Sequence, residues 1–413
     1  MNTILENVLL FDGKNNKTQS FKYLYIEDNK IKALSNDKIA DFKADKIIDV
    51  KGNYVLPGLI DAHVHLTSAG AVDLANDHFP KDLIAIKAYK AGQASLRRGF
   101  TTLRDAGGAG LGIAKAFAEN AESTPRLFYS GKALSTTNGH GDFRHSGESD
   151  CCSCQISGST ISALCDGVPE ALKATREQLR EGATQIKIMA AGGIASPTDK
   201  VTNLQFSDDE ILAIVDEATR YDTYVMAHAY TPKALMRCVK LGVRSLEHAN
   251  LLDEESAKYI AKHNAFIVPT LAIYEAFYTH GKEFNTPQHV INKLDGVRKA
   301  AVNAITIAHE NNVNVGFGSD LLGELMQFQC TEFSIRQQVE TPFQTLHSAT
   351  YKNAQLLNME GKLGVIQPGA YADILVVNSN PLDNIDVMTQ PEKNLKLIIK
   401  DGEISLNKLG LSK

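Results

Sequence analysis

The central part of this chain alternates short apolar runs with longer stretches of helical character, eight times over about 300 residues. Such alternation is typical of βα units that build a parallel sheet. Eight units in this length indicate an α/β fold with a (β/α)₈ TIM barrel. An open doubly wound sheet would instead carry a Gly-rich phosphate turn after its first strand, where this chain has His63-Val64-His65. The predicted strands are 58–66, 101–105, 126–130, 185–190, 224–229, 245–249, 265–270 and 313–319.

Both ends of the chain have a different pattern. Residues 1–56 hold short alternating apolar runs broken by Asp-Gly and Asn-Lys turns, and no helical period persists there. The C-terminal stretch returns to this pattern, with strands predicted at 372–377 and 395–399. Two β-segments at opposite ends of a chain most economically form one sheet system. We therefore predict a small β-sandwich domain from residues 1–56 plus 360–413, and a barrel domain over residues 57–359.

Composition argues against two classes of partner. The formal net charge is −5 and the pI is near 6.2, so no basic surplus is available to neutralise nucleic-acid phosphates. No apolar run approaches the roughly 20 residues that a membrane span needs. The first residues show no positive n-region and no apolar h-region, so we expect no export signal and a cytoplasmic location.

Four of the six cysteines fall close together, at Cys151, Cys152, Cys154 and Cys165. A zinc knuckle would need paired C-x₂-C spacing, which the adjacent first two cysteines do not give. A loop with free thiols in a reducing compartment fits better, and a disulfide within the cluster is a further alternative.

Potential metal ligands cluster where the predicted strands end. In the first strand, His63 and His65 are two residues apart, and side chains at i and i+2 lie on the same side of a strand. Both can therefore face the barrel interior and hold one cation. Barrel enzymes keep their chemistry at the carboxyl ends of the strands, and burial of many polar groups without a metal would leave several without partners. Later strands add Lys187, His228, His248 and Asp320 at or near those ends.

Lys187 does not fit a simple ligand set. An ammonium group beside a dication would be repelled and expensive to bury. It can turn outward or pair with Asp105 or Asp320. Alternatively, the neutral amine can react with carbon dioxide to give a carbamate, whose two oxygens and negative charge can bridge two cations.

The sequence resembles the amidohydrolase superfamily over nearly its whole length. The stretch VLPGLIDAHVH at 55–65 resembles the superfamily's first-strand motif, and GVIQPGAYAD at 364–373 resembles its return to the small β-domain. Four further stretches resemble the binuclear dipeptidases and N-acyl-amino-acid hydrolases that are prolidase-like or ochratoxinase-like. These are KIMAAGG at 187–193, HAY at 228–230, LEHA at 246–249 and GSD at 318–320.

The resemblance implies two divalent metal ions, with zinc as the expected metal. A carbamate on Lys187 and a hydroxide would bridge the two ions. The first ion would be bound by His63, His65 and Asp320, and the second by His228 and His248.

The resemblance also implies roles in catalysis and substrate binding. Asp320 would take the proton of the attacking water and pass it to the leaving amine. His140, in the glycine-rich segment after the third strand, would polarise the scissile carbonyl. Tyr230 would bind the substrate's α-carboxylate. The family often has a second glycine before this histidine, where this chain has Asn138.

The predicted function is hydrolysis of the amide bond of dipeptides or N-acyl amino acids, including N-aryl-acyl ones, that have a free C-terminal carboxylate. The partner is then a small-molecule substrate, and a homo-oligomer is left open. The alternative is a deaminase or a cyclic-imidate (imidazolonepropionase-like) hydrolase, which usually carries one metal and does not need Lys187. A non-catalytic scaffold would be expected to lose ligands, and this chain keeps all six.

Specificity is expected in the loops after strands seven and eight, around residues 271–277 and 321–328. These loops mix apolar side chains with Glu324, so both a hydrophobic and a basic C-terminal residue of the substrate fit the sequence.

Overall fold

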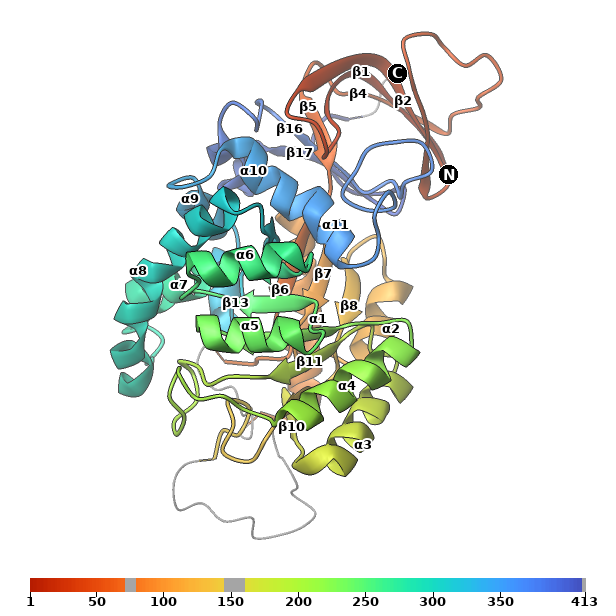
Figure 1. The fold of residues 1–413 in the computed structure, drawn as a ribbon. Coiled ribbons are helices and arrows are strands. Elements are labelled where there is room, and N and C mark those ends of the chain that lie inside the picture. Colours follow the sequence, from red (N-terminus) through yellow and green to blue (C-terminus); the bar gives the residue numbers. More distant parts are fainter. Residues whose placement is uncertain (71–78, 145–159, 411–413) are drawn as a thin grey trace.

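The structure is a computed structural model that describes residues 1–70, 79–144 and 160–410 of the chain. Strands from both ends of the chain form one eight-stranded sheet, with the order β18-β17-β16-β5-β1-β2-β3 and with β4 paired to β1. Figure 1 shows these N-terminal and C-terminal strands side by side at one end of the molecule. Their bounds are β1 Asn2–Phe11, β2 Thr18–Glu27, β3 Lys30–Ser35, β4 Lys46–Asp49, β5 Tyr54–Pro57, β16 Ile374–Val377, β17 Leu395–Lys400 and β18 Glu403–Asn407.

The middle of the chain forms a three-stranded and a seven-stranded sheet, and every strand pair in both is parallel. The orders are β6-β7-β8 and β10-β9-β11-β12-β13-β14-β15. The additional strands β9 and β10 were not predicted, because three-residue runs are too short to show a period. The bounds are β6 Leu59–Val64, β7 Phe100–Asp105, β8 Arg126–Tyr129, β9 Ala133–Ser135, β10 Ser162–Leu164, β11 Ile186–Met189, β12 Val225–Ala229, β13 Ser245–His248, β14 Phe266–Val268 and β15 Asn314–Val315.

Backbone hydrogen bonds join the two parallel sheets at two places, beside β6 and beside β8. On one side, the N–H of Ala62 donates to the carbonyl of Phe317 at 2.9 Å, and the N–H of Asp320 donates to the carbonyl of His63 at 2.8 Å. On the other side, the N–H of Thr184 donates to the carbonyl of Tyr129 at 2.8 Å. The residues after β15 therefore lie beside β6.

Helices follow most of the parallel strands and cover them. Figure 1 shows α4, α5 and α6 in front of β11 and β13. Several helices begin at a side-chain N-cap, such as Ser207 before α4 and Thr231 before α5. The longer helices are α1 Lys81–Arg97, α2 Leu111–Glu119, α3 Gly167–Arg180, α4 Asp208–Arg220, α5 Pro232–Lys240, α6 Glu254–Lys262, α7 Leu271–His280 and α8 Gln288–Glu310. The shorter ones are α9 Thr331–Arg336, α10 Pro342–His347, α11 Asn353–Leu356, α12 Pro391–Asn394, the 3₁₀ helices η2 Gly323–Phe328 and η4 Ile385–Met388, and the π-helix η3 Ser348–Lys352.

The packing of the helices decides which strand residues face inward. Alternate apolar residues of β11, β12 and β13 share one core cluster with the helices. Since successive strand side chains point to opposite sides, the residues between them face the interior. The cluster includes Ile186, Ile188, Val225, Leu246 and Ile267 from strands and Ile211, Ile214, Leu235 and Ile260 from helices. Lys187 and His228 thereby point inward.

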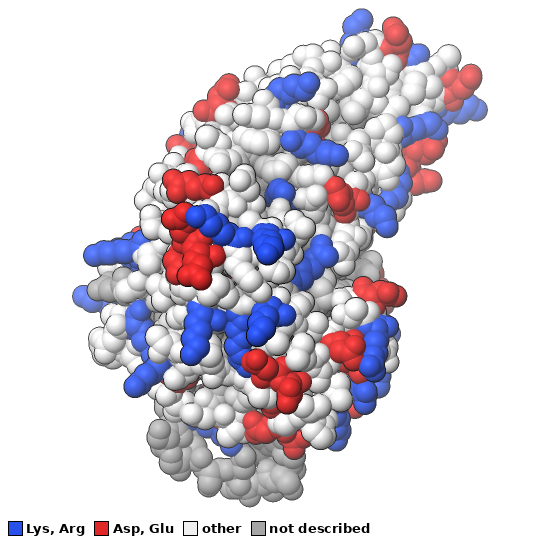
Figure 2. Space-filling model, viewed as in Figure 1, with Lys and Arg blue, Asp and Glu red and all other residues white. Residues whose placement is uncertain are grey.

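The surface shows both signs of charge. Figure 2 shows lysines and arginines interspersed with aspartates and glutamates over the helices of the face seen in Figure 1. Within the described part of the chain, no helix combines the length and the apolar character that crossing a bilayer requires.

Asn353 links the inner strands to the start of α11, and we predict that the fold depends on it. Its buried side chain donates to the carbonyls of Ile60 (2.7 Å) and Phe317 (2.8 Å) and accepts from the N–H of Phe317 at 3.0 Å. Asn353→Ala leaves the N–H of Phe317 buried without this acceptor and removes one donor from each of the two carbonyls, so it should lower the free energy of unfolding by about 1–3 kcal/mol. Denaturant unfolding followed by circular dichroism measures this loss. Asn292→Ala, at an exposed site on α8, is the control, and equal stability of the two variants would contradict the prediction.

Candidate metal centre and active site

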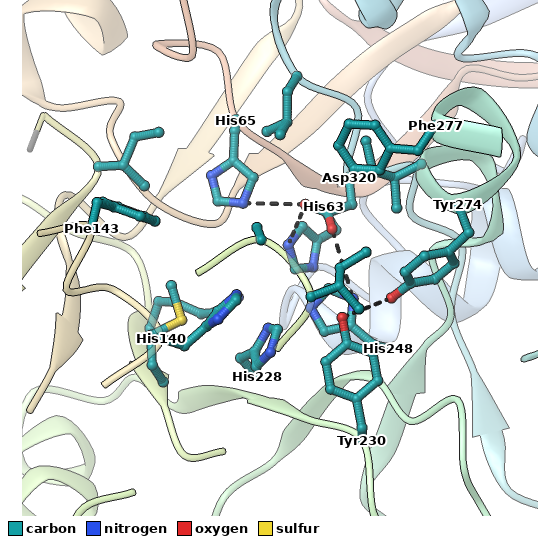
Figure 3. A pocket seen from close by; sticks show the side chains of 17 residues that line it. His63, His65, His140, Phe143, His228, Tyr230, His248, Tyr274, Phe277 and Asp320 are labelled. Atoms are coloured by element: carbon teal, nitrogen blue, oxygen red, sulfur yellow. Dashed lines mark hydrogen bonds and ion pairs between the residues drawn. The ribbon is translucent and has the colours of Figure 1, made fainter. Parts of the chain in front are cut away.

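All of the predicted site residues line one pocket, which contains about 540 Å³ of atom-free space, part of it open to solvent. Figure 3 shows the histidines arranged around this space with Asp320 among them. The structure thus brings together residues that are up to 257 positions apart in the sequence, from Asp320 back to His63. The predicted residues in the lining are His63, His65, His140, Lys187, His228, Tyr230, His248 and Asp320.

His63, His65 and Asp320 form the tightest group. Nε2 of each histidine lies 3.3 Å from Oδ1 of Asp320, and one ligand atom from each residue falls within 4.8 Å of the others. The outer nitrogens have their own partners. Nδ1 of His63 contacts a carboxylate oxygen of Glu247 at 2.7 Å, and Nδ1 of His65 contacts the carbonyl of Gly107 at 2.9 Å. Both histidines therefore direct Nε2 toward Asp320.

Asp320 is held in a backbone conformation that places its carboxylate in the pocket. Its φ is +55°, in the left-handed region, in the segment that follows β15. Burial alone would raise the pKa of Asp320, but the neighbouring His63 and His65, with His248, hold it well below its ordinary value. The carboxylate is therefore ionised at neutral pH and available as a ligand or a proton acceptor.

His228 and His248 form the other side of the pocket, with ring centroids 4.5 Å apart. Burial, together with neighbouring positive groups, lowers the pKa of both imidazoles well below the ordinary value. The rings are therefore neutral, which is the form that binds metal ions. Nδ1 of His248 contacts Oγ1 of Thr270 at 2.8 Å.

Lys187 is buried rather than turned outward, with 1% of its surface exposed. Within the described residues, no carboxylate oxygen lies within the 4.0 Å of its amine that an ion pair requires, so it does not pair directly with Asp105 or Asp320. Burial lowers the pKa of Lys187 to about 8, against the opposing effect of Glu247 and Asp320. Part of the lysine is then a neutral amine near neutral pH, which is the form that can react with carbon dioxide.

The donor set fits divalent metal ions. Nε2 of His63 and Nε2 of His228 are buried in the pocket lining and have no hydrogen-bond partner among the described residues. Such atoms are costly to desolvate unless something accepts their lone pairs. Neutral imidazoles together with a carboxylate are the ligands that zinc and similar divalent ions prefer.

Glu247 and Arg104 complete the centre, and we did not predict them. The Glu247 carboxylate is buried between His63 and the Arg104 guanidinium, whose Nη2 lies 3.0 Å away. Strand alternation should place Glu247 and His248 on opposite sides. His248, however, has a φ of +75°, which ends the regular strand and turns its ring inward beside Glu247. Burial opposes ionisation, but Arg104 and His63 lower the pKa of Glu247 to about 2.

His140 and Tyr230 also face the pocket. The His140 ring stacks on His228 with a centroid distance of 4.1 Å, and Nδ1 of His140 contacts the Ser196 hydroxyl at 2.9 Å. The hydroxyl of Tyr274 donates to that of Tyr230 at 3.1 Å. Asn138, where the family often has glycine, adopts a φ of +58°. Asparagine tolerates this left-handed conformation better than most residues, so the loop shape does not require glycine.

Only part of the two predicted specificity loops lines the pocket. Glu324 does not belong to this lining; it lies 3.3 Å from the Lys87 amine beside a separate surface hollow. Phe328 stacks on His280 instead. The loop residues in the lining are Ile273, Tyr274, Phe277 and Leu322.

Of the predicted cysteine cluster, only Cys165 lies in the described part of the chain. It is buried and free, and burial raises the pKa of its thiol to about 12. Cys151, Cys152 and Cys154 lie outside the described residues.

Comparison with known proteins identifies the class. The model of the amidohydrolase family matches residues 54–404. Ochratoxinase from Aspergillus niger is 30% identical over 360 residues, covering 82% of this chain and 73% of that protein. The crystal structure of an amidohydrolase is similar at a TM-score of 0.95 and 42% identity, covering 99% of this chain and 100% of its own. The crystal structure of a prolidase complexed with N-methylphosphonate-L-proline is similar at a TM-score of 0.94 and 43% identity. The match covers 98% of this chain and 99% of that one.

The chain therefore belongs to the amidohydrolase family. It is an amide-hydrolysing enzyme of the kind that generally uses divalent metals. The sequence resemblance to prolidase-like and ochratoxinase-like members is confirmed.

We predict that Glu247 supports metal binding through His63. Glu247→Gln removes the carboxylate that orients Nδ1, and loss of such a partner typically weakens metal affinity by roughly 10- to 100-fold. Competition with a chelating dye measures the affinity. Ser245→Ala is the matched control, because it removes the 2.5 Å bond to the other Glu247 oxygen and leaves the His63 contact in place. Unchanged affinity in a folded Glu247→Gln variant would show that His63 needs no carboxylate as its outer partner.

Proposed function

We propose that this enzyme uses two divalent metal ions to hydrolyse the amide bond of dipeptides or N-acyl amino acids that have a free C-terminal carboxylate. The observation that carries this proposal is the shared pocket of six metal-ligand candidates, His140 and Tyr230. Lys187 belongs to that lining, which favours this reaction over the single-metal deaminases and cyclic-imidate hydrolases that do not need it.

In this proposal, zinc is the metal, and Lys187, as a carbamate, would belong to the ligand set. His63, His65 and Asp320 would hold one ion, and His228 and His248 the other. Bound there, the ions would lower the pKa of a water molecule and draw electron density from the scissile carbonyl. The buried Nε2 atoms of His63 and His228 support this ligand set, because an ion would satisfy both.

Asp320 moves the proton. Its carboxylate is ionised and has 18% of its side chain exposed to the pocket. It accepts a proton from the attacking water at a carboxylate oxygen and then donates it to the nitrogen of the leaving amine. The hydrogen bond from its own N–H to the carbonyl of His63 fixes its position relative to the ligands.

His140 and Tyr230 bind different parts of the substrate. Nε2 of His140 donates to the carbonyl oxygen, on which negative charge develops during attack. The hydroxyl of Tyr230 accepts from Tyr274, which leaves its own proton free to donate to the substrate's α-carboxylate. The carboxylate is charged throughout the reaction, so this second contact contributes to binding rather than to the chemical step.

The substrate side chain is selected by apolar walls. Several pocket-lining residues are aliphatic or aromatic, and Glu324 lies in a different hollow, where a basic substrate side chain would not reach it. An apolar residue next to the scissile bond therefore fits better than a basic one. The solved prolidase with a phosphonate of L-proline points the same way. The apolar lining comprises Phe143, Ile161, Met189, Ile194, Ala195, Ile273, Phe277 and Leu322.

We also propose that the parallel strands close into a (β/α)₈ barrel over residues 57–359, with a β-sandwich domain from 1–56 plus 360–413. The hydrogen bonds from Ala62 to Phe317 and from Thr184 to Tyr129 support closure, because they join the two parallel sheets on both sides of the three-stranded sheet. Self-association and a cytoplasmic location stay predictions of the sequence.

We predict that His140→Ala and Tyr230→Phe fail in different ways on N-acetyl-L-leucine and on its C-terminal amide. His140→Ala should lower kcat on both compounds by roughly 10²–10³, the usual cost of one donor to a developing oxyanion. Tyr230→Phe should raise KM for the acid and leave the amide nearly unchanged, because the hydroxyl matters only when the carboxylate is present. Steady-state kinetics measures both effects.

The control is Tyr278→Phe, which alters an exposed tyrosine of α7. If Tyr230→Phe weakens the acid and the amide equally, Tyr230 does not bind the carboxylate, and the preference for free acids loses its support.

A further inference from the structure

The loop between β11 and α4 places two buried polar residues behind His140, outside the metal ligands. Ser196 has no exposed surface, and Asp199 is 4% exposed. Nδ1 of His140 lies 2.9 Å from the Ser196 hydroxyl and 3.4 Å from Oδ2 of Asp199. The Ser196 hydroxyl in turn makes a short hydrogen bond to Oδ1 of Asp199. These three side chains form a continuous chain from the pocket into the loop.

The direction of these hydrogen bonds follows from the chemistry of their ends. A carboxylate only accepts, so the Ser196 hydroxyl donates its proton to Asp199. Because the Ser196 proton is already donated, the contact between the Ser196 oxygen and His140 is a hydrogen bond in which Nδ1–H of His140 donates. Burial alone would raise the pKa of Asp199, but His140, Ser196 and Lys293 hold it at about 2, so the carboxylate is ionised. The proton on Nδ1 of His140 is therefore specified by the loop.

The other ring nitrogen of His140 faces the reaction space. A Cβ built on Gly193 would lie 2.6 Å from Nε2 of His140 and 2.6 Å from Nε2 of His228. The two Nε2 atoms therefore border the same small volume, and Nε2 of His140 lies next to a proposed metal ligand. The contact of Nδ1 with Ser196 therefore turns the Nε2 edge of the His140 ring toward the pocket.

Two further side chains hold this loop in place. The Lys293 amine of α8 donates to the carbonyls of Gly193 (2.9 Å), Ser196 (3.0 Å) and Asp199 (2.8 Å). The Gln205 amide accepts from the N–H of His140 at 2.8 Å and donates to Oδ2 of Asp199 at 3.0 Å. Lys293 from α8 and Gln205 from the end of the loop thus fix the position of Asp199, and Gln205 also holds the backbone of His140.

We propose that Asp199, acting through Ser196, is a positioning residue that orients the His140 ring, so that Nε2 is directed at the carbonyl oxygen. This inference rests on the proposed amide hydrolysis. We call the hydrogen-bonded chain Asp199–Ser196–His140 the relay. It acts in addition to the proposed metal ligands and to Tyr230.

A double-mutant cycle on the metal-loaded enzyme tests the relay. With N-acetyl-L-leucine, Asp199→Asn should lower kcat by about 10- to 100-fold with little change in KM, since the loss cannot exceed that of the donor it positions. In a His140→Ala background, the same change should alter kcat by less than about 2-fold, because its effect passes through His140. An effect of Asp199→Asn that is equally large in both backgrounds would overturn the proposal and make Asp199 an anchor of the loop only.

Two more variants keep the test decisive. Ser196→Ala interrupts the relay but leaves Asp199 bonded to Gln205 and to the N–H of Gly193, so it should lower kcat in the same direction even if Asp199→Asn folds poorly. Unchanged kcat in Ser196→Ala and in folded Asp199→Asn would refute the relay. Asp208→Asn, an exposed residue paired with Arg237, is the control.

A readout without substrate separates this inference from the proposed function. The Nδ1–H proton of His140, assigned by its absence in His140→Ala, should give a slowly exchanging signal in ¹H–¹⁵N spectra of the histidine rings. Asp199→Asn and Ser196→Ala should shift this signal or broaden it beyond detection. If the enzyme cleaves no N-acyl amino acid but this signal behaves as expected, the proposed function fails and the relay stands. A signal unaffected by both variants would overturn the relay itself.

Discussion

The structure depends on how the pocket imidazoles are held by their outer nitrogens. In four of the histidines Nδ1 is engaged, and this leaves Nε2 for the interior, where the rings approach one another to within 4.1–5.3 Å. The rings of His228 and His248 are neutral, and their lone pairs gain nothing from each other. A divalent cation among them is the simplest source of stabilisation. The outer partners are Glu247 for His63, Gly107 for His65, Ser196 for His140 and Thr270 for His248.

The outer partners of the histidines also connect the site to the strands of the fold. Glu247 can stand behind His63 only because the buried Arg104 balances its charge, and Arg104 in turn donates to the carbonyl of Ala62 at 2.6 Å. Asp61, in the strand that carries His63, accepts from Ser319 and Gln329 and so ties β6 to the segment that presents Asp320. Ligand geometry and strand pairing are therefore secured by one set of buried polar contacts. Breaking one of them leaves a charge without a partner, which is more costly than the loss of a surface ion pair.

Sequence reasoning found the ligands because they follow simple periodicities. His63 and His65 are two residues apart on one strand, and Lys187 and His228 lie between apolar residues that pack under helices. Parallel strands bring their carboxyl ends to one edge, so residues far apart in the chain meet there. The parallel sheets and the mixed sheet built from both chain ends follow from the same kind of pattern.

The outer partners could not be found in this way. Glu247 faces inward together with His248 because a left-handed residue interrupts the strand, and a two-residue period does not show such an interruption. Ser196 and Asp199 lie in a loop without periodicity and contact His140 across more than 50 positions. Glu324 was expected near the substrate from its place in the chain, whereas the ion pair with Lys87 holds it at another hollow. These positions are decided by tertiary contacts rather than by local pattern.

The central claim is a binuclear centre that includes Lys187, and metal content tests it most directly. Protein purified with zinc and bicarbonate, and then freed of loosely bound metal, should contain about two ions per chain by elemental analysis. Lys187→Ala prepared in the same way should contain fewer, because the bridging group is lost. One tightly bound ion in the wild-type protein, or two ions in both proteins, would contradict the account.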